Sequence, residues 1–366
     1  MTIIKSWLRT IHILPFASIA VLGLAFGIGT SNLWFSAIAA LFLASAVMTA
    51  VHHAEVIAER VGESLGTLIL ALSVTIIEVG LIVSLMMADG PDSGVLARDT
   101  VFAAVMIVSN GIVGLCLILG GLRHREQGFH VQGASSLLVV LIALSALTLV
   151  LPTFTTATAG ATYSPIQLIF ASAASLVLYV VFVVFQTRTH TEYFQHRGDD
   201  GSPVSAEAST GHHISKTEAW LSFLSLCVSL IAVIGLAKFL APTIETAVVA
   251  VGAPKTVVGI IIAIIVLLPE AGAAINAARA NRLQTSLNLA LGSGAASIAL
   301  TIPVVGAFSL WTNRPLTLGL DPKGLVFLFV TFLMGTLTLG TGKATALQGA
   351  VHMVLLLAYI VVAFFP

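Results

Sequence analysis

Charge is what this sequence lacks most. Only 9% of its 366 residues are charged, whereas 58% are hydrophobic, and the mean hydropathy is +1.06. A soluble domain carries roughly 25% charged residues, so a soluble globular protein is excluded and an integral membrane protein is indicated. The formal net charge is zero and no basic block occurs, which argues against a nucleic-acid partner and leaves the lipid bilayer as the expected surroundings.

Cysteine, alternating strand patterns and cleavage signals are also scarce. The two cysteines, Cys116 and Cys227, lie within apolar runs, where a small buried hydrophobe is the better interpretation than a disulfide or a metal ligand. Strands of alternating polarity are absent, which disfavours a closed barrel. The first apolar run lacks a clear small-residue cleavage site, so we expect it to be an uncleaved span.

Long apolar runs fill the rest of the chain. A membrane-spanning helix needs about 20 mostly apolar residues. Cutting the sequence at its polar clusters predicts eleven such helices in an all-α protein, centred near Ala20, Ala40, Val74, Val108, Ile142, Ser175, Leu230, Ile262, Ala295, Thr331 and Leu355.

Lysine and arginine suggest which side each connection lies on. With a cytoplasmic N-terminus, eleven fall on the inside and five on the outside, and these together make the 16 in the chain. The longest polar segment, "QTRTHTEYFQHRGDDGSPVSAEASTGHHISK", then reads as a flexible cytoplasmic linker between two halves. The predicted organisation is an N-terminal helix (1–30), a first half (31–186), a linker (187–216) and a second half (217–366).

With the N-terminal helix set aside, five helices lie on each side of the linker, and this number has a topological consequence. An odd number per half means that the two halves insert with opposite orientations, as in inverted-repeat transporters. Glu78 and Glu270 fall in the second helix of their respective halves. Placing a charge near the centre of a membrane helix costs about 2.5 to 3.5 kcal/mol, so each acid should face the bundle interior or water. A structural acid paired with a buried cation is the alternative for Glu78, and Lys238 is the nearest candidate.

Glu270 follows a proline in "LLPEAGAAINAARANR". Pro269 removes a backbone donor and frees a carbonyl near Ile265, which predicts a broken helix lining a cavity. A packing kink with an incidental acid is the alternative. Carboxylate and carbonyl oxygens are the ligands that Ca²⁺ or Na⁺ requires. Two carboxylates 4 Å apart would repel by about 4 kcal/mol at an effective dielectric constant of 20, so protons or a cation must neutralise them. That competition is in itself an exchange mechanism.

Other polar residues are weaker candidates. Intrahelical bonding, close helix packing and membrane-interface histidines are the alternatives for them. Supporting ligands are predicted at Thr75, Asn110, Asn288, Ser293 and Ser297, and a cytoplasmic mouth at His53 and Glu55 beside His52. We interpret His352 as a core histidine whose hydrogen bonds are satisfied.

Two segments carry a family resemblance. The stretch "PEAGAAINAARANRLQTSLNLALGSG" resembles the alpha-repeat of the calcium/cation antiporter superfamily. The stretches "HHAEVIAERVGESLGTLILALSVTIIEVGLI", "GLRHREQGF" and "GKATALQGAVHMVLLLAYIVVAFF" resemble its cation/proton exchanger branch. "TRTH" before a histidine-containing linker and "RDTVFAAVMIV" are similar to the bacterial ChaA-type calcium/sodium/proton antiporters.

This resemblance implies eleven helices, two inverted alpha-repeats and an essential acid in each, at Glu78 and Glu270. It implies a multi-pass protein of the bacterial inner membrane that carries inorganic cations and protons and needs no resident cofactor. The branch usually has Gly-Asn ahead of each acid, but here Val74 and Thr75 precede Glu78, and Val266 and Leu267 precede Glu270. The glutamine expected in the second repeat falls at or beside Ala296, and the Ser-Asn of the first repeat is displaced toward Ser109 and Asn110. With fewer side-chain oxygens, the site should admit Na⁺ or K⁺ as well as Ca²⁺.

Two other functions fit the same residues less well. A cation channel could use the acids as a selectivity ring. An intramembrane metal hydrolase could use His52, His53, Glu55 and His352, but "HHAEV" lacks the HExxH spacing and a zinc site needs about three protein ligands in one cavity. The sequence therefore predicts a non-enzymatic cation/proton antiporter that exports Ca²⁺, and also Na⁺ or K⁺. It does not indicate an oligomeric state.

Overall fold

The protein is described by a computed structural model covering residues 2–29, 32–61, 63–87, 93–195 and 215–366. It is almost entirely helical, and each of the eleven predicted centres falls within a helix. The helices form two compact units, one of residues 1–90 and 211–258 and the other of 91–210 and 259–366. Each unit therefore takes helices from both predicted halves. The repeat boundaries concern topology rather than packing, and they stay a prediction.

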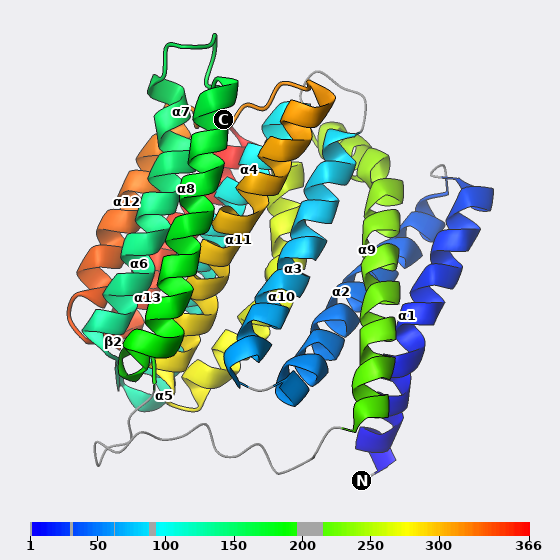
Figure 1. Cartoon of the computed structure of the whole chain (residues 1–366), viewed down its shortest axis with the longest axis horizontal. Helices are drawn as coiled ribbons and strands as arrows, with labels where there is room; N and C mark the ends of the chain where they lie inside the picture. The colour runs from blue at the N-terminus through cyan, green and yellow to red at the C-terminus, as the bar shows by residue number, and fades with distance from the viewer. Residues whose placement is uncertain (1, 30–31, 62, 88–92, 196–214) are drawn as a thin grey trace. The chain divides into compact units, whose positions relative to one another are not determined.

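Unit 1 is a bundle of long helices in which α9 packs against the other three (Figure 1). Its contacts with α2 include an edge-to-face pair, Phe35 and Phe239, with ring centroids 5.7 Å apart. The buried hydroxyls of Thr49 and Ser229 also lie 3.3 Å apart. The unit consists of α1 (Thr2–Ile28), α2 (Leu33–Val61), α3 (Glu63–Met86) and α9 (Lys216–Ala250).

Unit 2 contains the remaining helices, several of which include π-helical turns. The fourth span of the chain, which is the third of the first half, consists of α4 (Ser93–Met106), η1 (Ile107–Ile112) and α5 (Val113–His124). The next two are α6 (Val131–Ser145), η2 (Ala146–Val150) and α7 (Leu151–Phe154), followed by α8 (Pro165–Val184) with η3 (Phe185–Thr189) and the short η4 (Thr191–Tyr193). After the linker come α10 (Thr256–Arg279), α11 (Leu283–Thr312), α12 (Pro322–Leu339) and α13 (Ala346–Phe364), with strands β1 (Glu126–Gly128) and β2 (Lys343–Thr345).

In unit 2, helices of the first half pack against helices of the second half. The third span of the first half, through α5, packs on α13, the last helix of the second half. Conversely α11, the third helix of the second half, packs on α8, the last helix of the first. The α5–α13 contact brings the backbones together, since a Cβ on Gly349 would lie 2.6 Å from the carbonyl oxygen of Gly114. Such reciprocal pairing is what two halves related by a two-fold axis produce.

Connections predicted to share a side of the membrane are bonded to one another. On the predicted inner side, β1 and β2 form a two-stranded antiparallel sheet that joins the α5–α6 and α12–α13 connections. On the predicted outer side, Thr162 and Thr317 form an isolated bridge, and Thr317 also donates its N–H to the carbonyl of Gly94. The grouping of these connections is therefore confirmed, while the face that meets the cytoplasm stays a prediction.

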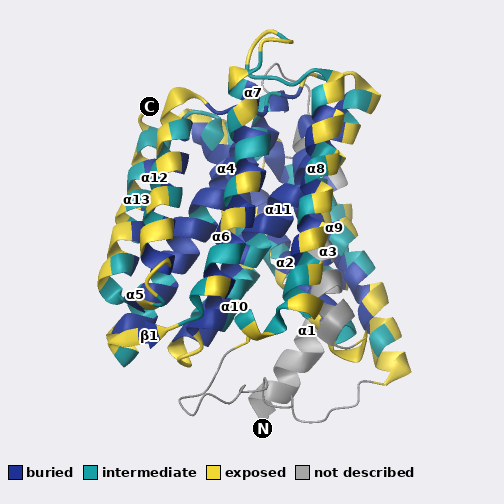
Figure 2. Cartoon of the chain, turned by 60° about the vertical axis from the view of Figure 1, so that its left-hand side comes forward, coloured by how far each residue is buried: buried dark blue, intermediate teal, exposed yellow. Residues whose placement is uncertain are grey.

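The outer faces of the helices suit a bilayer. Among the described residues, nine helices are long and apolar enough to span a membrane, and α1 and α3 contribute shorter apolar stretches. Figure 2 shows exposed positions along α8 and α12, and the exposed residues of α12 include the apolar stripe Val326, Phe329, Leu333 and Leu337. Trp34 and Trp311, both strongly exposed, lie at helix ends, where indole rings favour the membrane interface. The all-α membrane fold is confirmed.

The structure bears on two further predictions, the helix break at Pro269 and the linker between the halves. The predicted break at Pro269 is wrong, because α10 is helical from Thr256 to Arg279 with the proline inside it. A proline costs a membrane helix one backbone hydrogen bond, and neighbouring helices can compensate for that loss. The predicted linker (187–216) lies largely outside the described residues, and its described beginning is still helical in η3 and η4.

Candidate functional site

Glu78 is a buried carboxylate on α3. Its residue is only 4% exposed, and Thr75, Ser73 and Ile77 beside it are also buried. Ile76, two positions earlier and so about 200° around the helix, is 40% exposed. The acid therefore lies on the face of α3 turned away from lipid. Two residues on, a Cβ at Gly80 would meet the side chain of Ile234 on α9, so a small residue allows α3 and α9 to approach closely here.

Glu270 lies on α10, partly buried, directly after Pro269. Unit 2 holds this helix at both ends. Near its start, a Cβ on Gly259 would lie 2.9 Å from the backbone nitrogen of Thr100. Near its end, the side chain of Gln127 donates to the carbonyl of Ala278 at 2.8 Å. Between these points lie about 28 Å of helix, at 1.5 Å per residue, and Glu270 falls within that stretch.

The third helices of the two halves bring predicted supporting ligands into one region of unit 2. A Cβ on Gly294 of α11 would lie 3.2 Å from the side chain of Val108 on η1. Ser293 precedes Gly294, and the buried Ser297 lies one turn further on. Beside Val108 on η1, Ser109 is 5% exposed and its hydroxyl has no hydrogen-bond partner among the described residues. Ser109 of the first half and Ser293 and Ser297 of the second therefore lie on the two helices that meet here.

Asn110 is fully buried on η1, and both ends of its carboxamide are engaged. Its Nδ2 donates to Thr331 Oγ1 at 2.9 Å, and its Oδ1 lies 3.0 Å from Nδ1 of His352. The other ring nitrogen of His352 lies 3.1 Å from Thr338 Oγ1. His352 is thus a buried, hydrogen-bonded histidine, as the sequence predicted, and it contacts a candidate ligand.

Asn288 has a different setting from the other candidates. Its Oδ1 accepts from Gln284 at 2.9 Å, and its Nδ2 donates to the carbonyl of Phe194, which belongs to the start of the linker. Phe194 in turn packs edge-to-face on Phe182 and Phe185. The structure therefore places Asn288 in an anchor for the linker at the beginning of α11.

The residues of the predicted cytoplasmic mouth lie on α2. His53 is fully buried, whereas Glu55 is exposed. The rings of His52 and His53 lie 5.5 Å apart, edge to face. Within the described ranges, no three His, Cys, Asp or Glu side chains form a group that could hold a metal ion.

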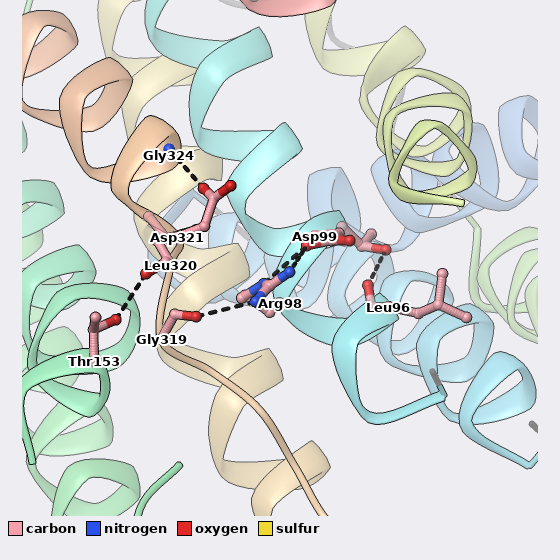
Figure 3. A network of polar contacts seen from close by, with 9 residues as sticks. Leu96, Arg98, Asp99, Thr153, Gly319, Leu320, Asp321 and Gly324 are labelled. Carbon is pink, nitrogen blue, oxygen red and sulfur yellow. Dashed lines mark hydrogen bonds and ion pairs between the residues drawn. The ribbon is translucent and has the colours of Figure 1, made fainter. Parts of the chain in front are cut away.

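An ionic cluster that lies in the first turns of α4 was not predicted from the sequence. Arg98 and Asp99 form an ion pair at 2.8 Å, and both side chains are largely shielded from solvent. Arg98 also donates to the carbonyl of Gly319 at 3.1 Å (Figure 3). Two residues on, Asp321 caps α12 by accepting from the N–H of Gly324. The adjacent "RD" before a long apolar run was the available signal.

Comparison with solved structures shows the fold. The chain aligns with the structure of native YfkE at a TM-score of 0.73 and 18% identity, over 97% of this chain and all of that one. It also aligns with the crystal structure of the H⁺/Ca²⁺ exchanger CAX at a TM-score of 0.69 and 16% identity, over 98% of this chain and 88% of that one.

Sequence comparison shows the family. The chain is 45% identical to y4hA of Sinorhizobium fredii, whose name specifies ionic transport without an ion, over 97% of this chain and 91% of that protein. It is 34% identical to the sodium-potassium/proton antiporter ChaA of Escherichia coli, over 89% and 88% of the two chains. The model of the sodium/calcium exchanger protein family matches residues 20–188 and 221–365. With most of its length covered by that match, the chain belongs to the sodium/calcium exchanger family.

Proposed function

We propose that this protein is a secondary active antiporter that moves a cytoplasmic cation outward in exchange for protons by alternating access. The observation that carries this proposal is a pair of acids in corresponding helices of the two halves. Glu78 is buried on a face turned away from lipid, and Glu270 lies within a helix that unit 2 holds at both ends. Acids retained at such positions are usually part of an ion or proton pathway.

Protons and cations would compete for these two carboxylates. A buried carboxylate is more stable when it is protonated or when it binds a cation, so release of one favours binding of the other. Oxygens on η1 and α11 would complete the coordination. In inverted-repeat transporters, the binding site lies at the repeat interface near the membrane midplane. On this proposal Glu78 and Glu270 are the residues that bind the cation and the protons.

Names of the relatives suggest which ions to test. The Escherichia coli relative is named for sodium, potassium and protons, and an Aphanothece halophytica relative, 27% identical over 69% of this chain, is named a Ca²⁺/H⁺ antiporter. We propose that this chain accepts Na⁺ or K⁺ as well as Ca²⁺, because neither acid is preceded by the Gly-Asn that the exchanger branch usually has. We also propose that it resides in the bacterial inner membrane with its N-terminus in the cytoplasm, as the distribution of lysine and arginine favours.

Proton transport in everted membrane vesicles tests the proposal. Adding Ca²⁺, Na⁺ or K⁺ to energised vesicles should release protons, detected as recovery of a quenched ΔpH-sensitive dye. Glu78→Gln and Glu270→Gln should each reduce this release to background, because an amide cannot exchange a proton for a cation. Glu218→Gln, which alters an exposed acid at the start of α9, is the matched control and should retain activity.

Cation-dependent proton release in both acid variants would contradict the proposed site. A channel would give cation flux without coupled proton movement, and imposing a proton gradient would not drive its cation uphill. Uphill cation accumulation in proteoliposomes, driven only by a proton gradient, therefore separates an antiporter from a channel.

A further inference from the structure

A chain of four buried polar side chains lies in unit 2. It consists of Thr331 and Thr338 of α12, Asn110 of η1 and His352 of α13, each at most 3% exposed. Polar groups in a membrane-embedded bundle cost several kcal/mol when they lack partners. Here each group has at least one partner, at 2.9, 3.0 and 3.1 Å along the chain.

The direction of these hydrogen bonds determines which ring nitrogen of His352 carries a hydrogen. With the carboxamide oriented as in the structure, Oδ1 of Asn110 can only accept, so Nδ1 of His352 must carry the hydrogen. Thr338 can donate to or accept from the other ring nitrogen, because a hydroxyl does both. The bond from His352 to Asn110 therefore persists whether the imidazole is neutral or charged.

The backbone around Asn110 is irregular, so the contacts of its side chain bear on the geometry of the whole turn. Asn110 lies in a π-helical turn, and π-turns are rare and often occur at functional sites. The N–H of Val113 bonds to the carbonyls of Val108 and Asn110 rather than to that of Ser109, its α-helical acceptor. The contacts of Asn110 with Thr331 and His352 tie this irregular turn to both α12 and α13.

An amide oxygen has two acceptor positions, and His352 occupies one of those on Asn110. The other can face a cation. The chain cannot readily conduct a proton, because an amide would have to become an imidic acid to pass one on. The hydrogen-bonded chain is therefore suited to orienting the Asn110 carboxamide rather than to carrying protons.

We propose that His352 is a positioning residue for cation binding. Through its Nδ1–H it holds the Asn110 carboxamide, and with it the η1 turn, in the geometry in which the Asn110 oxygen contributes to the transported cation's site. This inference rests on the proposed function and extends it to a residue on the last helix.

Three substitutions at His352 distinguish the contact made by Nδ1 from the contact made by Nε2. In His352→Asn the side chain places a donor near the position of Nδ1, in His352→Gln it places one near Nε2, and in His352→Leu it supplies neither. His352→Leu should raise the apparent KM for Ca²⁺ and for Na⁺ roughly tenfold or more, the usual effect of removing a partner that orients a ligand. His352→Asn should recover most of that loss, and His352→Gln should not. Thr338→Val, which removes only the contact on the far side of the ring, should leave the KM near that of the wild type.

A double variant tests whether His352 acts through Asn110. Once Asn110→Ala has removed the carboxamide, adding His352→Leu should raise the KM no further. A further increase in that background would overturn the proposal. So would wild-type KM values in all three His352 variants, with loss of protein yield or thermal stability alone, because that is the behaviour of a merely structural residue.

Failure of the proposed function would be visible separately. If wild-type vesicles showed no cation-dependent proton release, exchange would be disproved, whereas the link from His352 to Asn110 could still be measured on the purified protein. The readout is then the Ca²⁺ concentration that produces half of the Ca²⁺-dependent shift in thermal unfolding. Should His352→Leu not fold, the comparison of the Asn and Gln variants decides the question by the same criteria.

Discussion

At the scale of single residues, the role of a polar side chain depends on the partners that packing brings to it. Charges inside apolar runs are expensive, so Glu78 and Glu270 are candidates on their sequence positions alone. The partner of Asn110 could not be found in this way, because His352 is 242 positions away and only packing brings them together. Amides, hydroxyls and histidines are tolerated in many settings, and their roles therefore depend on neighbours that the sequence does not specify.

The close packing of α5 and α13 at Gly349 can be tested by substitution. Gly349→Ala should destabilise the protein by about 1–3 kcal/mol, because its Cβ would lie 2.6 Å from the carbonyl oxygen of Gly114 and 2.7 Å from the backbone nitrogen of Ile118, and backbone atoms cannot easily move away. Thermal unfolding in detergent measures the effect. Gly23→Ala on α1 is the control, since nothing lies within 4 Å of its added Cβ and alanine favours a helix. Equal unfolding temperatures for both variants would contradict the close α5–α13 packing.

At the scale of helices, hydropathy predicted all eleven, because a bilayer requires long apolar segments. It could not predict the π-turns of η1 and η2, which depend on contacts between helices rather than on composition. It also predicted a break at Pro269 that the structure lacks. The proline rule applies to an isolated helix, whereas α10 is supported near both ends through Gly259 and Ala278.

The ion pair at the start of α4 provides the prediction for this scale. Arg98→Leu should destabilise the protein by about 3 kcal/mol or more, because it leaves the Asp99 carboxylate shielded without its cation and removes the bond to Gly319. Adding Asp99→Asn should restore part of the loss by removing the orphaned charge. Unfolding temperatures of the two single variants and the double variant measure this coupling. Simple addition of the two single effects would show that the pair does not act as a unit.

At the scale of the whole molecule, the sequence anticipated which connections lie together but not the compact units. Because successive spans cross the membrane in opposite directions, alternate connections are expected on the same side, and the β1–β2 sheet bonds two of them. The units could not be foreseen because each combines helices from before and after the linker. Pairing of α5 with α13 and of α11 with α8 is a long-range property, which a chain written in order does not display.

The lengths of the last two helices have a consequence for the membrane in which the protein works. The helices α12 and α13 have 18 and 19 residues, or about 27–29 Å of helix, and capping side chains of Asp321 and Thr345 fix where they begin. A hydrocarbon core is about 30 Å thick, so these helices have no length to spare for tilt. Exchange measured in proteoliposomes of increasing acyl-chain length should fall once the bilayer exceeds that span, and a rate independent of chain length would contradict this expectation. Bilayer thickness would then limit where this exchanger can operate, through hydrophobic mismatch at α12 and α13.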